Sequence, residues 1–168
     1  MGTYYWAGGQ RVELEPDDEH VAIDQKLAQR AGLDTEIKTA TETGKRVGGG
    51  VLVAPRSSLR ADTLASLRDA GALQSVYKRQ RAVIVPMPEI RIELDNPKQR
   101  RAVMDVLTER ASEHAITEDT DDQMVLRPTS GSGDDALKLA NQIYEQAHPA
   151  AASVRFIQFV PKPTSDRA

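Results

Sequence analysis

The sequence predicts an α+β protein in which elements follow one another in the order strand, helix, strand, strand, helix, strand, twice along the chain. Apolar residues alternate with polar ones in several short runs, as in strands with one buried face. Between these runs, apolar residues recur at the spacing of amphipathic helices. A helix, a Ser-Val pair and an apolar run stopped by proline occur both near the middle and at the end of the chain. This recurrence predicts two related units.

Composition and charge limit what the protein can bind. The 168 residues suffice for one ordinary domain or two small ones, and 39% are apolar, which is enough for a core. Only 4% are aromatic, so that core must be mainly aliphatic. The 22 basic and 25 acidic residues give a net charge of −3, which provides no electrostatic reason for a nucleic acid or an anionic membrane as the main partner. We therefore expect a protein partner, with no nucleic acid and no membrane involved.

The chain contains no cysteine. Disulfides, thiolate zinc sites and cysteine nucleophiles are therefore excluded. The N-terminus lacks a basic segment followed by an apolar one, and no apolar run is long enough to cross a membrane. These features predict a cytoplasmic protein, and we expect no cofactor because no complete cofactor motif is present.

The first half of the chain predicts a β-hairpin followed by a degenerate first unit. Residues 4–14 form the hairpin, because their central Gly-Gly pair supplies the positive φ values of a tight turn. Residues 34–50 are polar and rich in glycine, and we expect an exposed hairpin or a mobile loop there. Ser57 or Ser58 is expected to cap a helix. The other elements expected here are a strand over 19–25, a short helix over 26–31, a strand over 51–53, a helix containing Leu64 and Leu67, and residues 75–77 leading into a strand over 82–86.

The second half gives clearer signals. Residues 89–94 alternate strictly, which indicates a strand with one buried face. Asn96 is expected to cap a helix running to about Ser112, and Gln99 can reach back to the cap. Ser132, with an acidic residue three positions on, starts the next helix. The remaining elements expected are strands over 114–117 and 123–127 flanking an acidic tip, the helix itself from about 134 to 147, and a terminal strand over 153–160.

This order is that of the ferredoxin-like split βαβ unit. The predicted architecture is two tandem ferredoxin-like (βαββαβ) units, the first degenerate, preceded by the N-terminal hairpin. The expected divisions are residues 1–87 for the hairpin and first unit, 88–161 for the second unit, and 162–168 for a C-terminal tail.

Several short patterns resemble the fervidolysin-type N-terminal prodomain of bacterial subtilisin-like serine proteases. The aromatic pair, Gly-Gly turn, leucine and proline of residues 4–16 resemble its opening. Residues 125–127, the Ala-Leu and Leu-Ala-Asn steps of residues 136–141, and residues 154–159 resemble its end. Together these patterns cover most of the chain, whereas residues 27–50 match no named pattern. No catalytic motif of the protease is present.

The resemblance implies binding by contact and no enzymatic activity. Such prodomains dock one face of their sheet on the protease, and the segment after the last strand lies in the active-site cleft as a slow product. The platform here would be the strands at 89–94, 122–127 and 153–160, with the Ala168 carboxylate near the catalytic serine. The protein is then expected to bind a subtilisin-like serine protease in trans as an inhibitor or folding chaperone. The residues expected to bind this partner are Phe156, Phe159, Val160, Pro161, Lys162, Pro163, Thr164, Ser165, Asp166, Arg167 and Ala168.

Other functions have weaker support in the sequence. The three histidines lack the spacing of metal ligands, so no metal site is expected. No catalytic triad can be assembled, and the serines near residue 131 are better explained as helix caps. An adaptor module of a multi-component bacterial system, without a protease partner, remains the main alternative. A small-ligand sensor is a third possibility.

Two groups of side chains have open interpretations. The basic residues at 78–81 and 98–101 favour a solvated face or a rim that matches an acidic partner. RNA is disfavoured, because the strands at 89–94 and 123–127 contain no aromatic residue on which bases could stack. The aromatic residues Tyr4, Tyr5 and Trp6 are either core packing or a contact patch.

Overall fold

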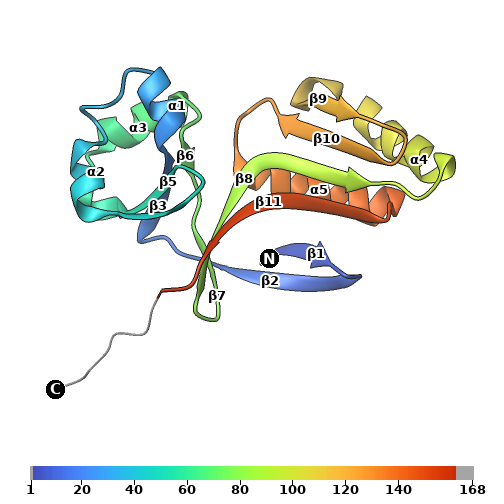
Figure 1. Ribbon diagram of the computed structural model, residues 1–168, viewed down its shortest axis with the longest axis horizontal. Helices are drawn as coiled ribbons and strands as arrows, with labels where there is room; N and C mark the ends of the chain where they lie inside the picture. Colours follow the sequence, from blue (N-terminus) through green and yellow to red (C-terminus); the bar gives the residue numbers. More distant parts are fainter. Residues whose placement is uncertain (1, 162–168) are drawn as a thin grey trace.

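The computed structural model describes residues 2–161 and shows a mixed α+β protein with two antiparallel sheets. Figure 1 shows two bodies that meet where β2, β7, β8 and β11 cross. The bounds are β1 Thr3–Ala7, β2 Gln10–Pro16, β3 His20–Asp24, α1 Gln25–Arg30, α2 Lys38–Thr43, β4 Lys45–Gly48, β5 Val51–Pro55, α3 Ala61–Asp69, β6 Leu73–Gln74, β7 Tyr77–Arg79, β8 Ala82–Glu93, α4 Pro97–Thr108, β9 His114–Asp119, β10 Gln123–Pro128, α5 Gly133–Ala147 and β11 Ala151–Phe159. Short 3-10 turns cover Arg56–Ser58 and Ala111–Glu113.

The two bodies have sheets with the same strand order. In residues 20–74, called the N-terminal unit below, the strands lie in the order β4-β5-β3-β6. In residues 82–159, called the C-terminal unit, the corresponding order is β9-β10-β8-β11, because β10 pairs with both β9 and β8 and β11 pairs with β8. The hairpin of β1 and β2 joins the second sheet through β7, which lengthens that sheet to seven strands.

The helix starts of the C-terminal unit confirm the caps at Asn96 and Ser132, whereas Gln99 reaches past the cap to the residue before it. The Gln99 amide donates to the Asn96 side chain (2.9 Å), and Gln99 in turn accepts from the amide of Asp95 (2.7 Å). The Asp135 amide donates to the Ser132 hydroxyl (3.2 Å) at the start of α5. These bonds satisfy amide groups that have no partner inside the helix.

Several expectations for the first half were wrong. Residues 38–43 form helix α2, where a loop or hairpin was expected, because Ala40 is fully buried there in the core of the N-terminal unit. The serines at 57 and 58 lie in a 3-10 turn before α3, and neither caps that helix. The last strand of the N-terminal unit is β6, and residues 77–79 belong to the other sheet.

Strand β8 also differs from the expectation. The strands expected at 82–86 and 89–94 form one continuous strand of 12 residues. The expected division between residues 87 and 88 therefore lies inside β8. Helix α4 ends at Thr108, four residues before the expected end.

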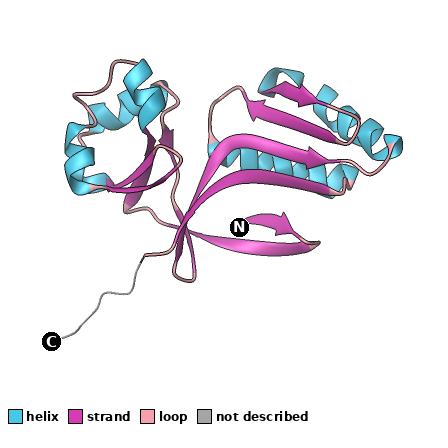
Figure 2. Ribbon diagram, viewed as in Figure 1, coloured by secondary structure: helices cyan, strands magenta, loops and turns pink. Residues whose placement is uncertain are grey.

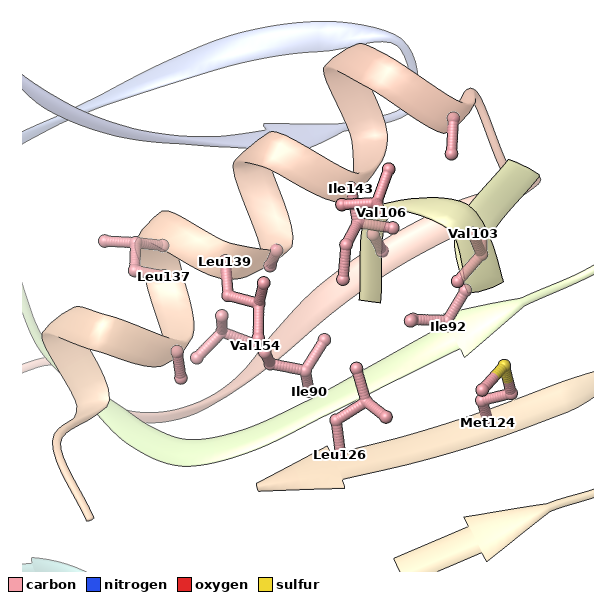
Figure 3. Packing of buried hydrophobic residues seen from close by; sticks show 14 of the residues in the cluster. Ile90, Ile92, Val103, Val106, Met124, Leu126, Leu137, Leu139, Ile143 and Val154 are labelled. Atoms are coloured by element: carbon pink, nitrogen blue, oxygen red, sulfur yellow. The ribbon is translucent and has the colours of Figure 1, made fainter. Parts of the chain in front are cut away.

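Three clusters of buried side chains hold the fold together. One lies between α4, α5 and the sheet of the C-terminal unit, where Leu139 lies beside Val154 and Ile143 beside Val106 (Figure 3). A second fills the N-terminal unit between its helices and its sheet. The third joins the two units, because Ala22 and Val51 on the other face of the N-terminal sheet pack with Val85 of β8.

The aromatic residues of the first hairpin pack on α5. The Trp6 ring stacks on Tyr144 with centroids 5.1 Å apart, and the Tyr4 hydroxyl donates to Glu145 (3.0 Å). The Tyr5 ring contacts Phe156 of β11 at a centroid distance of 4.8 Å. Core packing is therefore confirmed for Tyr5, whereas Tyr4 and Trp6 pack on α5 and remain partly exposed.

Candidate functional site: the open face of the C-terminal sheet

Among residues 2–161, no helix covers one of the two faces of the C-terminal sheet. Figure 2 shows α5 behind β8 and β11, so that the opposite side of these strands faces the viewer. Strand periodicity explains the division, because even-numbered Ile90 and Ile92 enter the core while their neighbours point the other way. We call this surface the open face; it consists of Glu89, Arg91 and Glu93 of β8, Val125 and Arg127 of β10, and Ser153 and Arg155 of β11.

The open face is mainly polar and carries charges of both signs, with Arg91, Arg127 and Arg155 against Glu89 and Glu93, around the buried Val125. Arg91 lies opposite Val125 on one side and Ser153 on the other, at the centre of the face. The Arg127 guanidinium lies 3.8 Å from the Glu89 carboxylate. Arginine side chains of this kind can form paired hydrogen bonds with a partner's carboxylates. The face is thus suited to a polar protein surface.

The corresponding face of the N-terminal unit has a different composition and a different role. Its residues Ala22, Val51 and Val53 are apolar and lie against β8 in the cluster between the units. In the matching strands of the C-terminal unit, polar residues such as Arg91 and Arg127 occupy this face. This face of the N-terminal sheet is therefore buried between the two units, whereas the open face of the C-terminal sheet remains accessible.

The end of β11 lies beside the N-terminal unit. A Cβ added to Gly49 in the turn between β4 and β5 would lie 2.7 Å from the Ile157 side chain, so this turn is in contact with β11. The Lys45 ammonium lies 5.8 Å from the centroid of the Phe159 ring. Val160 follows with 61% of its surface exposed. The chain thus leaves the sheet between β4 and the turn after β7.

The predicted contact residues fall into three groups. Phe156 is half-buried against Tyr5 in the core. Phe159 is half-buried beneath Lys45, Val160 is exposed, and Pro161 is half-buried. Residues 162–168, which make up most of the predicted set, lie outside the described residues. The partner-binding role of all of them stays a prediction.

A hydrogen-bonded latch ties the segment between the units to the start of α5. The Tyr77 and Ser75 hydroxyls both donate to the Asp134 carboxylate, at 2.7 and 2.5 Å. The Gln74 side chain donates to the Gly131 carbonyl (2.9 Å) and accepts from the Gly133 amide (2.7 Å). Burial, and then the bond to Asp134, raises the pKa of Tyr77. The latch fixes the orientation of α5 behind the open face.

We expect Tyr77→Phe to lower the free energy of unfolding by about 1–2 kcal/mol at pH 7, because it removes a hydrogen bond to a carboxylate. Tyr5→Phe is the matched control, since the Tyr5 hydroxyl has no hydrogen bond among the described residues. Urea unfolding measures the free energy of unfolding of both variants. A raised tyrosine pKa stabilises the fold fully below about pH 10, and this contribution is lost as the pH rises through the higher folded-state value. The difference between wild type and Tyr77→Phe should therefore shrink at alkaline pH, and an unchanged difference would contradict the assignment.

A groove of about 890 Å³ runs along α5 beside β1. Its principal polar groups already have partners within the protein. Asp134 binds Tyr77, Glu145 binds Tyr4, and the Asn141 amide donates to the Tyr4 carbonyl (2.8 Å). These bonds leave the groove with little of the convergent polar lining that a small-ligand site needs.

Asp17, Glu19 and His20 are brought together between β2 and β3, with possible ligand atoms within 4.8 Å of one another. The sequence prediction missed this group, although its Asp-x-Glu-His spacing is visible. Asp17 accepts from the Glu19 amide (3.1 Å), lies 2.9 Å from His20 Nδ1 and lies 3.6 Å from the Lys78 ammonium. Burial raises the pKa of Asp17, but the hydrogen bonds from His20 and the Glu19 amide, together with the charges of His20 and Lys78, lower the pKa overall. The carboxylate is thus held as an anion that joins the hairpin to the N-terminal unit.

No protein-family model matches this chain, and no curated protein matches it either. Within residues 2–161, no helix is both long enough and apolar enough to cross a membrane.

Proposed function

We propose that this protein binds a subtilisin-like serine protease in trans and acts as its inhibitor or folding chaperone. It does so by contact, without catalysing a reaction of its own. In this proposal the two units are tandem ferredoxin-like units, and the C-terminal one corresponds to the prodomain. The matching strand orders of the two sheets support this description.

The observation that supports the function best is the relation between the open face and β11. Both helices of the C-terminal unit lie on one side of its sheet, so the other side is free to dock. The same sheet supplies β11, and the chain leaves it at the exposed Val160. A protein with this layout can dock its sheet and present its final residues to a cleft at the same time.

The test is inhibition of a subtilisin-like protease by the purified full chain, followed by hydrolysis of a small chromogenic peptide. We expect the chain to slow hydrolysis, and we expect Ser153→Tyr to weaken inhibition roughly tenfold, a change of about 1.4 kcal/mol. The reason is that Ser153 lies opposite Arg91 at the centre of the open face. Tyrosine is compatible with a strand, so the fold should be retained.

Gln158→Tyr is the matched control. Gln158 is exposed on the same strand, but it lies opposite Ile84 and therefore on the other face of the sheet. Inhibition by this variant should stay close to that of wild type. If wild type neither binds nor slows any such protease, the proposal fails.

A second candidate is an adaptor that binds a protein other than a protease. It is favoured by the internal packing of Phe156 and Phe159, which leaves the open face as a docking surface that does not require a tail. For an adaptor, removal of residues 161–168 would leave partner binding unchanged. For an inhibitor whose tail lies in the active-site cleft, the same removal would weaken partner binding.

A further inference from the structure

Three cations surround the point where the chain leaves the C-terminal sheet. Lys45 comes from β4, Arg79 is the last residue of β7, and Arg81 lies in the tight turn that joins β7 to β8. All three are exposed. We call this set the basic collar.

Strand register places the collar beside the end of β11. Phe159 pairs with Val83 of β8, two residues after Arg81, and Arg79 pairs with Ala82. Lys45 reaches the same place from the other unit, since its ammonium lies over the Phe159 ring. Figure 1 shows the turn after β7 next to the end of β11. Arg79 shares with Ala82 the face opposite to that of Val83 and Phe159, so cations that are far apart in the sequence flank the exit from both faces of the sheet.

No carboxylate among residues 2–161 neutralises the charge of the collar. Among the described residues, Lys45, Arg79 and Arg81 form no salt bridge. The neighbouring Lys78 differs, because its ammonium lies 3.6 Å from the buried Asp17 carboxylate. The exposed Val160 adds an apolar contact at the same exit. The combination of unpaired cations and one exposed aliphatic side chain is typical of a protein-binding rim.

We propose that the basic collar binds an acidic protein surface next to the cleft that receives the end of the chain. The inference rests on the proposed function in assigning that surface to the protease. Opposite charges at the rim of an interface act mainly on the rate of association, and salt screens them. The collar therefore brings the end of β11 to the cleft before the open face docks.

An acidic protein fits the collar better than a nucleic acid does. Carboxylates lie directly behind it, because Glu15 pairs in register with Lys78 and Asp17 binds the same lysine. They would repel an extended phosphate backbone that ran beyond the collar. The net charge of −3 also disfavours binding of a nucleic acid.

The first experiment needs no protease. A short polyglutamate peptide is added to the isotope-labelled full chain, and backbone amide shifts are followed by NMR at low and high salt. We expect shifts at Lys45, Arg79, Arg81 and Val160 that vanish at high salt and are lost in the double variant Arg79→Glu with Arg81→Glu. Shifts absent from these residues would overturn the proposal. Tighter binding of a single-stranded oligonucleotide at the same residues would also overturn it.

The second experiment measures association with the protease by stopped flow. Reversal of Arg79 and Arg81 should slow association roughly tenfold and flatten its salt dependence. The control reverses Lys98 and Arg101, which are exposed on the distant helix α4 and should not matter. If the protease binds but the collar variant associates as fast as wild type, the proposed role of the collar is refuted and the proposed function stands. If the peptide binds the collar but the protease does not bind the chain, the proposed function fails and the collar serves another acidic protein.

Discussion

Gly133→Ala is expected to destabilise the protein strongly, although it adds only one methyl group. Gly133 is the first residue of α5 and lies against the backbone of β8. A Cβ at this position would overlap the Pro86 carbonyl oxygen and lie 2.5 Å from its carbon, and neither atom belongs to a flexible side chain. The helix start must therefore move away from the strand. The hydrogen bond that the Gly133 amide donates to the Gln74 side chain (2.7 Å) would then be lost as well.

The expected loss in the free energy of unfolding is about 3–5 kcal/mol, since overpacking and a broken buried hydrogen bond add. This is a large part of the total stability of an ordinary domain, about 5–15 kcal/mol. Urea unfolding measures it, and thermal unfolding serves if the variant is only partly folded. Gly71→Ala is the control, because Gly71 has a φ of +70° but no atom within 4 Å of an added Cβ. It should cost about 1–2 kcal/mol through backbone strain alone. Equal losses in both variants would mean that the contact between α5 and β8 is not close.

Strand β8 continues through Pro86, where the first of two strands was expected to end. Proline cannot donate to a strand ladder, and a second proline, Pro88, lies two residues further on. In the structure β7 pairs with β8 only as far as Ile84, and β10 begins to pair at Ile90. The prolines lie in the gap between these two partners, where no donor is needed on that edge. Only the tertiary arrangement reveals that gap.

The alternation of residues 89–94 was sufficient to predict which side chains face away from the helices. Alternation depends on the backbone alone, so it is visible in the sequence. The latch of Ser75, Tyr77 and Asp134 was not predictable, because it joins residues 57 and 59 positions apart. The basic collar could be predicted only in part. The run at 78–81 was visible as a basic cluster, whereas the approach of Lys45 depends on how the two units pack.

Helix α2 was missed for a related reason. Its six residues include no strong apolar period, and short helices are marginal without tertiary contacts. Burial of Ile37 and Ala40 in the N-terminal core stabilises it. Local pattern therefore predicted elements that have their own amphipathic face and missed the one that depends on its neighbours.

Removal of residues 161–168 is the change expected to have the largest effect on function. In the proposed complex these residues occupy the active-site cleft, and their prolines limit the entropy lost on binding. We expect the truncated chain to inhibit the protease at least roughly tenfold more weakly, a loss of about 1.4 kcal/mol or more. Binding through the open face should persist, so the dissociation constant measured by calorimetry with an active-site-blocked protease should change much less than the inhibition constant.

This truncation separates a functional effect from a structural one. Strand β11 ends at Phe159, so the cut removes no strand residue, and the core contacts of Val154 and Phe156 remain. Urea unfolding should be the same for the truncated and full chains. A chain in which residues 161–168 are replaced by a Gly-Ser segment of equal length is the matched control for bulk at the exit, and it should inhibit as weakly as the truncated chain. If both variants inhibit as well as wild type, the tail does not occupy the cleft, and the open face alone must account for inhibition of the protease.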